Sequence, residues 1–555
     1  MAIEVDRIDG EVLILGGGLA ALRAAVSASD GGDGVVVATR GKLGRGGSSI
    51  GSGGGFAVAL GHADPEDSVE SHVDDTLRGG HRINDPRLVE ILCSEGPQRI
   101  LELDRMGGQF KRTPDGRLHQ SPSGEHRHAR VCQTEVHRGT TMTLPMTDVV
   151  LGRGVKVLEK VVCLDLLRSG RRVCGALLLD PAAGRLIEAR ATAVVLATGG
   201  AGRIYKITSN PSDVCGDGYA MAYRAGVELQ DMEMVQFYPW RLIAPIGKDG
   251  RIPVQPSTFV YGGKLYNRLG ERFMELFDPE RLEATARDVA ARGIYEQIRH
   301  GRDVEGGVLL DLSDVDPETF LAANSRIATV VSSKGLALEE MEMIVTPEVH
   351  FFMGGVRFGP EGETSLPGLF VAGEVAGGVH GANRLNGNAV TETQVFGARA
   401  GGAARRFAAD AGPVEPDPTV GERWRARLAS PARAEVDLEA VQEQLRERMW
   451  HDGGIVRVEE RLLAGRRWVG EQLAAIEAHV PADLDELERW ARVRNMVTVA
   501  DLVLLSALTR KESRGAHFRD DHPEMRDEWL VNVVIGRGED GPEVRLEPVP
   551  MGVVS

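Results

Sequence analysis

The sequence has 555 residues, 42% of them hydrophobic, so it can bury a large core, and about two to four domains are expected. Its net charge of −16 argues against a nucleic-acid surface, which needs clustered Lys and Arg side chains. No apolar run reaches the roughly 20 residues of a membrane span, so no span is predicted.

Two further patterns bear on where the protein works. The first residues lack a basic stretch followed by an apolar one, so we predict no secretion signal. The cysteines are scattered without a C-x-x-C pair, which excludes an iron–sulfur or structural zinc motif of the usual spacing in this chain. An odd number of cysteines without framework spacing is typical of a reducing compartment. We therefore expect a cytoplasmic protein.

Residues 11–29 predict a buried strand, a tight glycine turn and an alanine-rich helix. The turn has the G-x-G-x-x-A pattern, with Gly16, Gly18 and Ala21 at its fixed positions. In this pattern the first glycine makes the turn, and the second lets a pyrophosphate approach the N–H groups at the helix start. The alternative is a tight turn without a ligand, but the flanking strand and helix favour dinucleotide binding.

A second strand, over residues 34–40, ends where dinucleotide-binding proteins often carry an acidic ribose ligand. Thr39 stands there instead, followed by Arg40, so an NAD-type interpretation loses support. Both residues remain candidate cofactor contacts.

Residues 44–60 form a glycine-rich stretch that also contains Ser48 and Ser49. It could be a flexible linker. However, an apolar segment follows at once, and a linker inside a nucleotide-binding domain is awkward. We favour a loop laid along a cofactor, with Gly54 and Gly55 also in contact.

Residues 61–150 have a mixed, partly helical pattern that includes His126, His128 and His137. Three histidines suggest a metal site, but no acidic or cysteine ligand stands at a helpful spacing. We therefore predict no metal.

The next segments return to strand and helix patterns. Residues 154–180 predict a hairpin-rich insert, and residues 194–200 another strand that ends in a glycine turn. Ala197, Thr198 and Gly199 in this turn are candidate cofactor contacts. A glycine-started helix follows, and its Asp217 is a further candidate.

Composition then marks the remaining boundaries. Residues 236–350 contain short strands, turns and charged helices, which indicates an inserted second domain. A Pro-rich linker covers 411–419, and residues 420–526 show the 3.6-residue period of a helical bundle. The final residues, 527–555, predict a short strand pair or a tail.

Residues 371–400 carry the densest chemical signal. An apolar strand ends near Glu374, a glycine-rich loop holds Arg384, and a helix begins near Asn388. Glycine lets bare backbone approach a flat ligand, and the helix start offers free N–H groups. This arrangement suits a polar ring that gains negative charge, such as a reduced flavin, with Ala389 and Val390 as further contacts.

Several stretches, among them GGGLAALRAA, ATGGAGRIY, FVAGEVAGGVHGANRL, EVHFFMGGVRF and RKESRGAHFRDDHPE, together resemble the flavoprotein subunits of succinate dehydrogenase and fumarate reductase, and L-aspartate oxidase. The resemblance runs from about residue 10 to 525. It implies an α/β fold in which a Rossmann-like FAD-binding domain (1–235 and 351–412) is split by an inserted α+β capping domain (236–350). A C-terminal helical domain (420–526) and a tail (527–555) follow.

The resemblance also implies FAD and hydride transfer between its N5 atom and a carbon beside a carboxylate. His350 and Arg384 match the pair that grips a substrate carboxylate. Arg287 matches the arginine that exchanges a proton with substrate, although by itself it could equally form a salt bridge with Asp288. Glu374 matches the residue that holds the FAD ribose.

Departures from the family pattern bear on cofactor attachment and substrate. Ser48 replaces the histidine that carries covalent FAD in the respiratory enzymes, so FAD should be non-covalent. Tyr238 and Trp240 stand where the family grips a second carboxylate, and the stretch 255–261 also differs, so plain succinate or fumarate is disfavoured. Arg241 is the candidate for a relocated cation.

L-aspartate is also in question. The acidic residue that aspartate oxidases place before a Gly-Gly-His motif aligns best with Ser123, although Glu125 lies two residues on.

Three functions remain open from the sequence. The first is an FAD enzyme that acts on a small carboxylate at a Cα–Cβ or Cα–N bond. The second is the flavoprotein subunit of an electron-transfer complex with an iron–sulfur or other redox partner. The third, a non-catalytic flavin-fold protein, is disfavoured by the presence of Arg287, His350 and Arg384.

Overall fold

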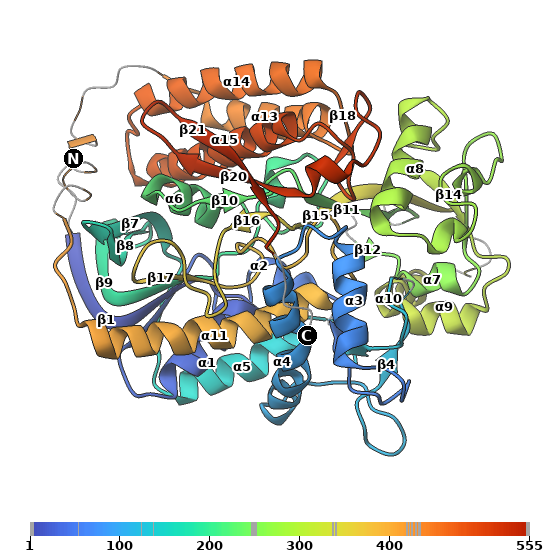
Figure 1. Ribbon diagram of the computed structural model, residues 1–555, viewed down its shortest axis with the longest axis horizontal. Coiled ribbons are helices and arrows are strands. Elements are labelled where there is room, and N and C mark those ends of the chain that lie inside the picture. Colours follow the sequence, from blue (N-terminus) through green and yellow to red (C-terminus); the bar gives the residue numbers. More distant parts are fainter. Residues whose placement is uncertain are drawn as a thin grey trace.

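The computed structural model describes residues 5–53, 55–123, 125–136, 138–245, 252–335, 338, 341–417, 420, 422, 424, 426–427, 430 and 435–550. Figure 1 shows a main body that holds both β-sheet and helix layers, and a lobe formed by α7 to α10 and β14 on its right. Within the described residues, none of the helices has an apolar stretch that could cross a bilayer.

The main sheet has the strand order β6-β2-β1-β9-β8-β7, with β17 also paired to β9. Strands β6, β2, β1, β9 and β17 are parallel, and β7 and β8 form an antiparallel hairpin edge. The strands are β1 (Val5–Leu15), β2 (Val35–Thr39), β6 (Lys156–Glu159), β7 (Val162–Ser169), β8 (Arg172–Asp180), β9 (Arg185–Leu196) and β17 (Leu369–Val371). Central strands buried on both faces read as continuous apolar runs, as β2 does with every residue buried.

Helices cover this sheet and meet at its carboxyl end. The long helix α11 (Asn388–Ala411) packs against α1 (Leu19–Ser29), where Gly401 allows close contact because a Cβ there would lie 2.3 Å from the Ala24 carbonyl oxygen. The other helices of this domain are α2 (Gly47–Gly51), α3 (Val69–Gly79), α4 (Pro86–Arg105), α5 (Thr140–Gly152) and α6 (Asp217–Ala225). A small sheet of β3 (Gly55–Ala57), β4 (Gln120–Ser121) and β5 (Val131–Gln133) lies beside them.

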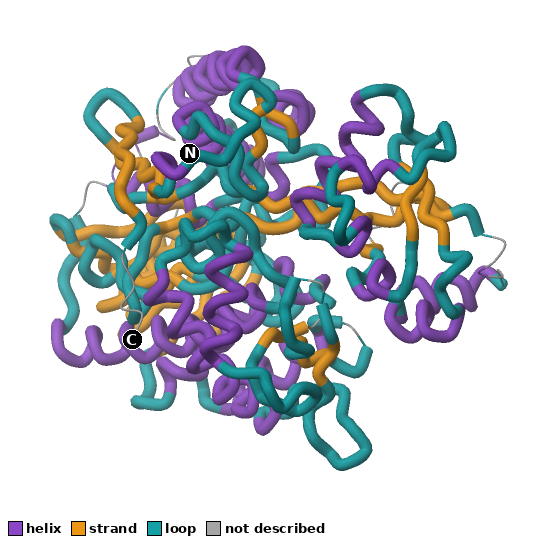
Figure 2. Tube along the Cα trace, turned by 45° about the vertical axis from the view of Figure 1, so that its right-hand side comes forward, coloured by secondary structure: helices purple, strands orange, loops and turns teal. Residues whose placement is uncertain are grey.

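The lobe on the right is an antiparallel sheet with its own hydrophobic core, and we call it the cap. Figure 2 shows it standing apart from the main body at the right of the view. Its strands are β11 (Val235–Ala244), β12 (Ile252–Pro253), β13 (Lys264–Tyr266), β14 (Val308–Asp311) and β15 (Met343–Phe352), and its helices are α7 (Ser257–Val260), α8 (Arg287–Arg299), α9 (Pro317–Ala323) and α10 (Ser325–Lys334). Strands β11 and β15 lead from the main body into the cap and back.

Within the continuously described residues 435–550, three α-helices are present: α13 (Leu438–Asp452), α14 (Glu459–Ala478) and α15 (Leu484–Thr509), stacked at the top of Figure 1. The carboxylates of Asp437 and Asp483 cap the N-termini of α13 and α15. The strand pair β18 (Val456–Arg457) and β19 (Phe518–Arg519) ties the segments around them.

Residues 531–548 form a hairpin. Strands β20 (Val531–Arg537) and β21 (Pro542–Pro548) join β10 (Leu229–Gln230) and β16 (Gly355–Val356) in one sheet. Main-chain hydrogen bonds therefore fasten the C-terminal segment to the FAD-binding domain. These features agree with the predicted fold class.

Candidate active site

A cavity of about 470 Å³ extends from the carboxyl end of the main sheet to the inner face of the cap. One part is lined by backbone and small side chains of the main body. The other part is lined by charged and aromatic residues, several of them from the cap.

The first part begins at the turn between β1 and α1. Gly16 has a φ of +137°, and a Cβ there would lie 2.1 Å from the Ala197 carbonyl oxygen. Gly18 caps α1 without a side-chain hydrogen bond, so the first turn of the helix faces the cavity. Free N–H groups and the positive end of the helix dipole favour a phosphate here.

The glycine-rich loop lies along the same cavity. Ser49 Oγ accepts a hydrogen bond from the Leu19 N–H at 3.1 Å, which fastens this loop to the start of α1. Asn210 Nδ2 donates to Ser48 Oγ at 3.4 Å. Both serines line the cavity, and a serine hydroxyl does not provide the imidazole nitrogen of a histidyl link to flavin.

Glu374 follows β17 and faces the cavity from the opposite wall. Its Oε1 accepts a hydrogen bond from the Phe352 N–H at 3.0 Å, and burial raises the pKa of this carboxyl to about 7. The carboxyl also packs directly on Gly200, where a Cβ would lie 2.2 Å from Glu374 Oε1. The carboxyl is therefore held in one place, where it can accept a hydrogen bond from a ligand hydroxyl.

Most of the predicted cofactor residues line the cavity: Gly16, Gly18, Thr39, Arg40, Ser48, Ser49, Gly55, Ala197, Thr198, Gly199, Asp217, Glu374, Arg384, Ala389 and Val390. Ala21 does not; it is fully buried in α1. Gly54 lies outside the described residues. Thr39 also has a packing role, since its Oγ1 lies 2.4 Å from where a Cβ on Gly17 would be.

Two helix starts, α1 and α11, thus face a long cavity with a polar loop and a carboxyl between them. The start of α11 is capped by Gly387, again without a side-chain hydrogen bond. This set of groups fits FAD, with its pyrophosphate at the first helix and its ring system at the second.

The second part contains two arginines that share one neutral acceptor. Arg384 donates to Gln236 Oε1 through Nε and Nη2, at 3.1 and 2.8 Å, and Arg287 donates to the same oxygen at 3.3 Å. The Gln236 amide is fixed because its Nε2 donates to Asn383 Oδ1 and to the Arg384 carbonyl. Burial, followed by the charge of Arg287, lowers the pKa of Arg384 to about 9. This pair of cations would be stabilised by an anion.

His350, on β15, lies beside the two arginines. Burial and the nearby charges of Arg384 and Arg287 hold its pKa well below the usual range, so the imidazole is neutral. Its Nδ1 is hydrogen-bonded to Ser209 Oγ at 2.9 Å. His350 therefore acts as a neutral hydrogen-bonding group, whereas the positive charge comes from the arginines.

Tyr238 lines the cavity between these groups and the cap core. Its ring centroid lies 5.2 Å from that of His350, and the Arg287 guanidinium carbon lies 5.3 Å from the Tyr238 ring. Its hydroxyl donates to the Val254 carbonyl at 2.6 Å. Tyr238 therefore presents its ring to the cavity while its polar end is engaged elsewhere.

The other two predicted substrate residues do not line this cavity. Trp240 packs on Phe259, with centroids 4.3 Å apart, and Arg241 Nε lies 3.6 Å from Glu348 Oε2. The structure instead brings Gln255, Arg326 and Glu348 to the wall. Burial lowers the pKa of Arg326, and nearby Arg138 lowers it further.

Sequence reasoning overlooked Gln236 and Arg326 and left Glu125 undecided. Glu125 Oε1 lies 3.5 Å from Arg287 Nε, and its Oε2 accepts from the Asn386 N–H at 2.7 Å. The sequence pointed to Glu125 only indirectly, because Ser123 stands where aspartate oxidases carry their acidic residue. Ser123 does not line the cavity. Gln236 begins the stretch 236–240 that was compared with the family pattern, but only Tyr238 and Trp240 were singled out there. No pattern in the sequence marked Arg326, because its place at the wall depends on contacts between distant elements.

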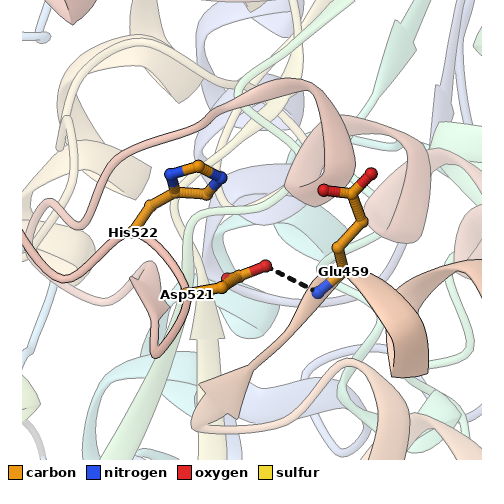
Figure 3. Close-up of side chains that lie close together, drawn as sticks. All are labelled: Glu459, Asp521 and His522. Carbon is orange, nitrogen blue, oxygen red and sulfur yellow. Dashed lines mark hydrogen bonds between the residues drawn. The ribbon is translucent and has the colours of Figure 1, made fainter.

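The histidines and the exposed acidic groups have other partners. His126 Nε2 is hydrogen-bonded to the Asn386 carbonyl and His128 pairs with Asp64; His137 lies outside the described residues. Figure 3 shows Glu459, Asp521 and His522 close together on the surface. The Asp521 carboxylate is engaged by Arg519, with two contacts of 2.7 Å, and accepts from the Glu459 N–H.

Comparisons with known proteins agree with this geometry. The family model for the FAD binding domain matches residues 11–390, and the model for the fumarate reductase flavoprotein C-terminus matches residues 442–554. An uncharacterized FAD-dependent oxidoreductase of Methanocaldococcus jannaschii is 39% identical over 95% of this chain and 96% of its own length. One subunit of the fumarate reductase (CoM/CoB) of Methanothermobacter marburgensis is 37% identical over 96% of this chain and 98% of its own.

The chloroplastic L-aspartate oxidase of Arabidopsis thaliana is 35% identical over 94% of this chain and 82% of its own length. Among solved structures, the E. coli quinol fumarate reductase FrdA superposes with a TM-score of 0.90 at 26% identity, covering 99% of this chain and 98% of that one. The chain therefore belongs to the family of FAD-dependent oxidoreductases that includes fumarate reductase and succinate dehydrogenase flavoproteins and L-aspartate oxidase.

Proposed function

We propose that this oxidoreductase transfers a hydride between its flavin and a substrate carbon next to a carboxylate. When bound, FAD gives or takes the hydride at its N5 atom. The observation that carries the proposal is the pair Arg384 and Arg287, buried together on one neutral amide oxygen. A substrate carboxylate is the anion that would compensate their charge.

In this proposal each side chain has one task. Arg384 and His350 grip the carboxylate, and the positive charge polarises the adjacent C–C or C–N bond. Arg287 exchanges a proton with the neighbouring substrate carbon.

We further propose that the substrate is larger than succinate or fumarate. Glu348 and His350 are two residues apart on β15, so their Cα atoms are about 7 Å apart, and both side chains line the cavity. Arg326 and Gln255 lie at the Glu348 end. A second polar group of the substrate would therefore have to lie well beyond the carboxylate grip, next to Arg326 rather than Arg241.

L-aspartate receives less support as the substrate. Glu125 is the acidic residue nearest in sequence to the position that is acidic in aspartate oxidases. It contacts Arg287 but does not line the large cavity. A substrate ammonium group in that cavity would not meet its carboxylate.

A second candidate function is that of a flavoprotein subunit that passes electrons to a partner. Its support is the relative from Methanothermobacter marburgensis, which is named as one subunit of its fumarate reductase and which this chain matches over nearly its full length. An iron–sulfur partner would then supply the cluster, since the cysteines of this chain have no cluster spacing. Rapid reoxidation of the photoreduced flavin by air would favour the self-sufficient enzyme, and slow reoxidation would favour the partner.

The test begins with the purified protein. We expect it to be yellow and to release FAD on acid or heat treatment, because Ser48 provides no histidyl link; flavin that stays with the precipitate would refute this. The reduced protein is then mixed with a panel of unsaturated acids that ranges from fumarate to longer monoacids and diacids. We expect a longer acid to reoxidise the flavin fastest, and brisk reoxidation by fumarate would contradict the size argument.

A further inference from the structure

Behind Arg287, away from the large cavity, two buried polar atoms face each other. Arg287 Nε and Glu125 Oε1 are 3.5 Å apart, and their side chains are 3% and 7% exposed. Among the residues that the structure describes, neither atom has a hydrogen-bond partner. Buried polar atoms are normally satisfied, and at 3.5 Å a small shift or one bridging water would join these two.

Hydrogen bonds to Asn386 hold the two side chains in place. Glu125 Oε2 accepts from the Asn386 N–H at 2.7 Å, and Asn386 Oδ1 accepts from Arg287 Nη2 at 3.0 Å. Arg287, Asn386 and Glu125 thus contact one another in a ring, and the Arg287 Nε–Glu125 Oε1 distance is the longest of the three.

A second cavity, of about 10 Å³, adjoins this contact. Such a volume approaches the room that one water molecule needs. Its lining residues are Glu125, Trp240, Pro256, Val260, Ala284, Thr285 and Arg287. The side chain of Val260 is 46% exposed, so this cavity lies close to the surface of the cap.

Thr285 links the small cavity to an acidic group nearer the solvent. Its Oγ1 donates to Asp278 Oδ2 at 2.6 Å, and Asp278 is half-buried. The stretch 255–261, in contrast, contributes only Pro256 and Val260 to this cavity, and neither carries an exchangeable proton. Proton-carrying groups therefore approach Arg287 from the Glu125 loop and from Thr285.

We propose that Glu125 is the residue that exchanges protons with Arg287, and that the small cavity with Thr285 and Asp278 connects it to solvent. This rests on the proposed function, in which Arg287 gives a proton to substrate. One proton then passes from the Glu125 carboxylic acid to the neutral Arg287 guanidine, leaving a carboxylate and a guanidinium. Glu125 regains a proton from cavity water, no electrons move, and oxidation of substrate runs the sequence backwards.

The test uses the FAD-loaded, pre-reduced protein and the unsaturated acid from the panel that reoxidises it fastest. For Glu125→Gln, which preserves the shape and the acceptor for the Asn386 N–H, we expect reoxidation to slow about 10²-fold. Binding of the acid, measured by perturbation of the flavin spectrum, should stay within about twofold, because Glu125 does not line the large cavity. The pH profile of the rate should lose one ionisation.

A second variant separates proton transfer from a structural role. In Glu125→Ala the truncated side chain enlarges the small cavity, and added formate should restore the rate in proportion to its concentration. Thr285→Val and Asp278→Asn should slow reoxidation by smaller factors, and exposed Glu66→Gln is the matched control. A wild-type rate and pH profile in Glu125→Gln, or a loss that formate does not relieve, would overturn the inference.

A failure of the proposed function would give a different result from a failure of the Glu125 route. If Arg287→Ala reoxidises at the wild-type rate, Arg287 carries no proton and the proposed function is wrong at its first step. If Arg287→Ala is slow while Glu125→Gln is not, only the Glu125 route is refuted.

Discussion

Two buried charge clusters in this protein are built in opposite ways. Around Arg510, which joins the last helices to the main body, the anions are in excess: it contacts Glu233 at 2.6 Å and Asp231 and Glu512 at 3.2 Å each. Arg384, by contrast, has no ion pair within the described residues, and its side chain donates to the neutral Gln236 oxygen.

The two environments have opposite effects on the pKa of a buried arginine. Burial tends to lower the pKa of Arg510, yet Glu233 and Asp231 outweigh it and the net change is upward. For Arg384, burial and the repulsion from Arg287 act together and lower the pKa to about 9. The first cluster supplies its own counter-charge, whereas Arg384 in the second has only a neutral partner among the described residues. In the proposed function a ligand carboxylate supplies the counter-charge of Arg384.

The largest expected effect comes from removing the two arginines that line the cavity. Arg287→Ala and Arg384→Ala should each lower turnover by about 10²–10⁴-fold, because they remove the proton carrier or the carboxylate grip. The Arg287 variant should keep its FAD, since the cofactor contacts lie elsewhere. Turnover assays with flavin absorbance measure both, and exposed Arg406→Ala at the far end of α11 is the control. Normal turnover in either variant would contradict the proposal that the cluster around Arg384 binds the substrate carboxylate.

The next effect is on stability. Arg510→Met should destabilise the fold by about 3–5 kcal/mol, because it leaves Glu233 and Asp231 buried without their cation. Denaturant unfolding measures this, and the half-exposed Arg545→Met should change stability by no more than about 1 kcal/mol. If Arg384→Ala destabilises the fold as much as Arg510→Met does, the distinction between the two clusters is lost.

A pH titration sharpens the difference at the site. Below about pH 9 Arg384 is charged, so its titration should not change the affinity for a carboxylate as the pH is varied. Above that value binding must take up a proton, and the dissociation constant should rise about tenfold per pH unit. Spectral titration with an inert carboxylate such as acetate tests this. Affinity that stays constant up to pH 11 would show that Arg384 keeps its charge.

A second pH effect is expected in the first cluster. Burial, followed by repulsion from Glu233, raises the pKa of Asp231 to about 7, above its ordinary value of 3.8. The folded state therefore holds a proton that the unfolded state loses, so stability should fall between about pH 4 and 7 by at most about 1.4 kcal/mol per unit. Asp231→Asn should flatten this slope in unfolding experiments at several pH values; an unchanged slope would assign it to other groups.

Local patterns explain why much of the cofactor part was predictable. The turn of Gly16 and Gly18, the serines of the glycine-rich loop and the strand before Glu374 each combine a fixed backbone shape with a short sequence signature. Such features need no knowledge of distant partners. The same holds for the helices after residue 437, whose caps and periodicity lie in adjacent residues.

The substrate part was harder because small changes of register decide which side chain faces the cavity. Strand β11 is irregular between Tyr238 and Arg241, and side chains on a strand point alternately to opposite faces. Tyr238, opposite Glu348, lines the cavity, whereas Arg241, opposite Thr346, does not. A cation from a separate helix, Arg326, lines that wall instead.

By itself, the sequence predicted a split nucleotide-binding fold that holds FAD, and its family resemblance singled out His350, Arg384 and Arg287 as candidates to act on a carboxylate. Those conclusions rest on contiguous motifs, whose backbone geometry is fixed by glycine, helix starts and apolar strands. Only the tertiary structure decided that Gln236 gathers two arginines and that Glu125 lies behind Arg287. Such contacts join segments far apart in the chain, and burial sets their electrostatics only once the chain is folded.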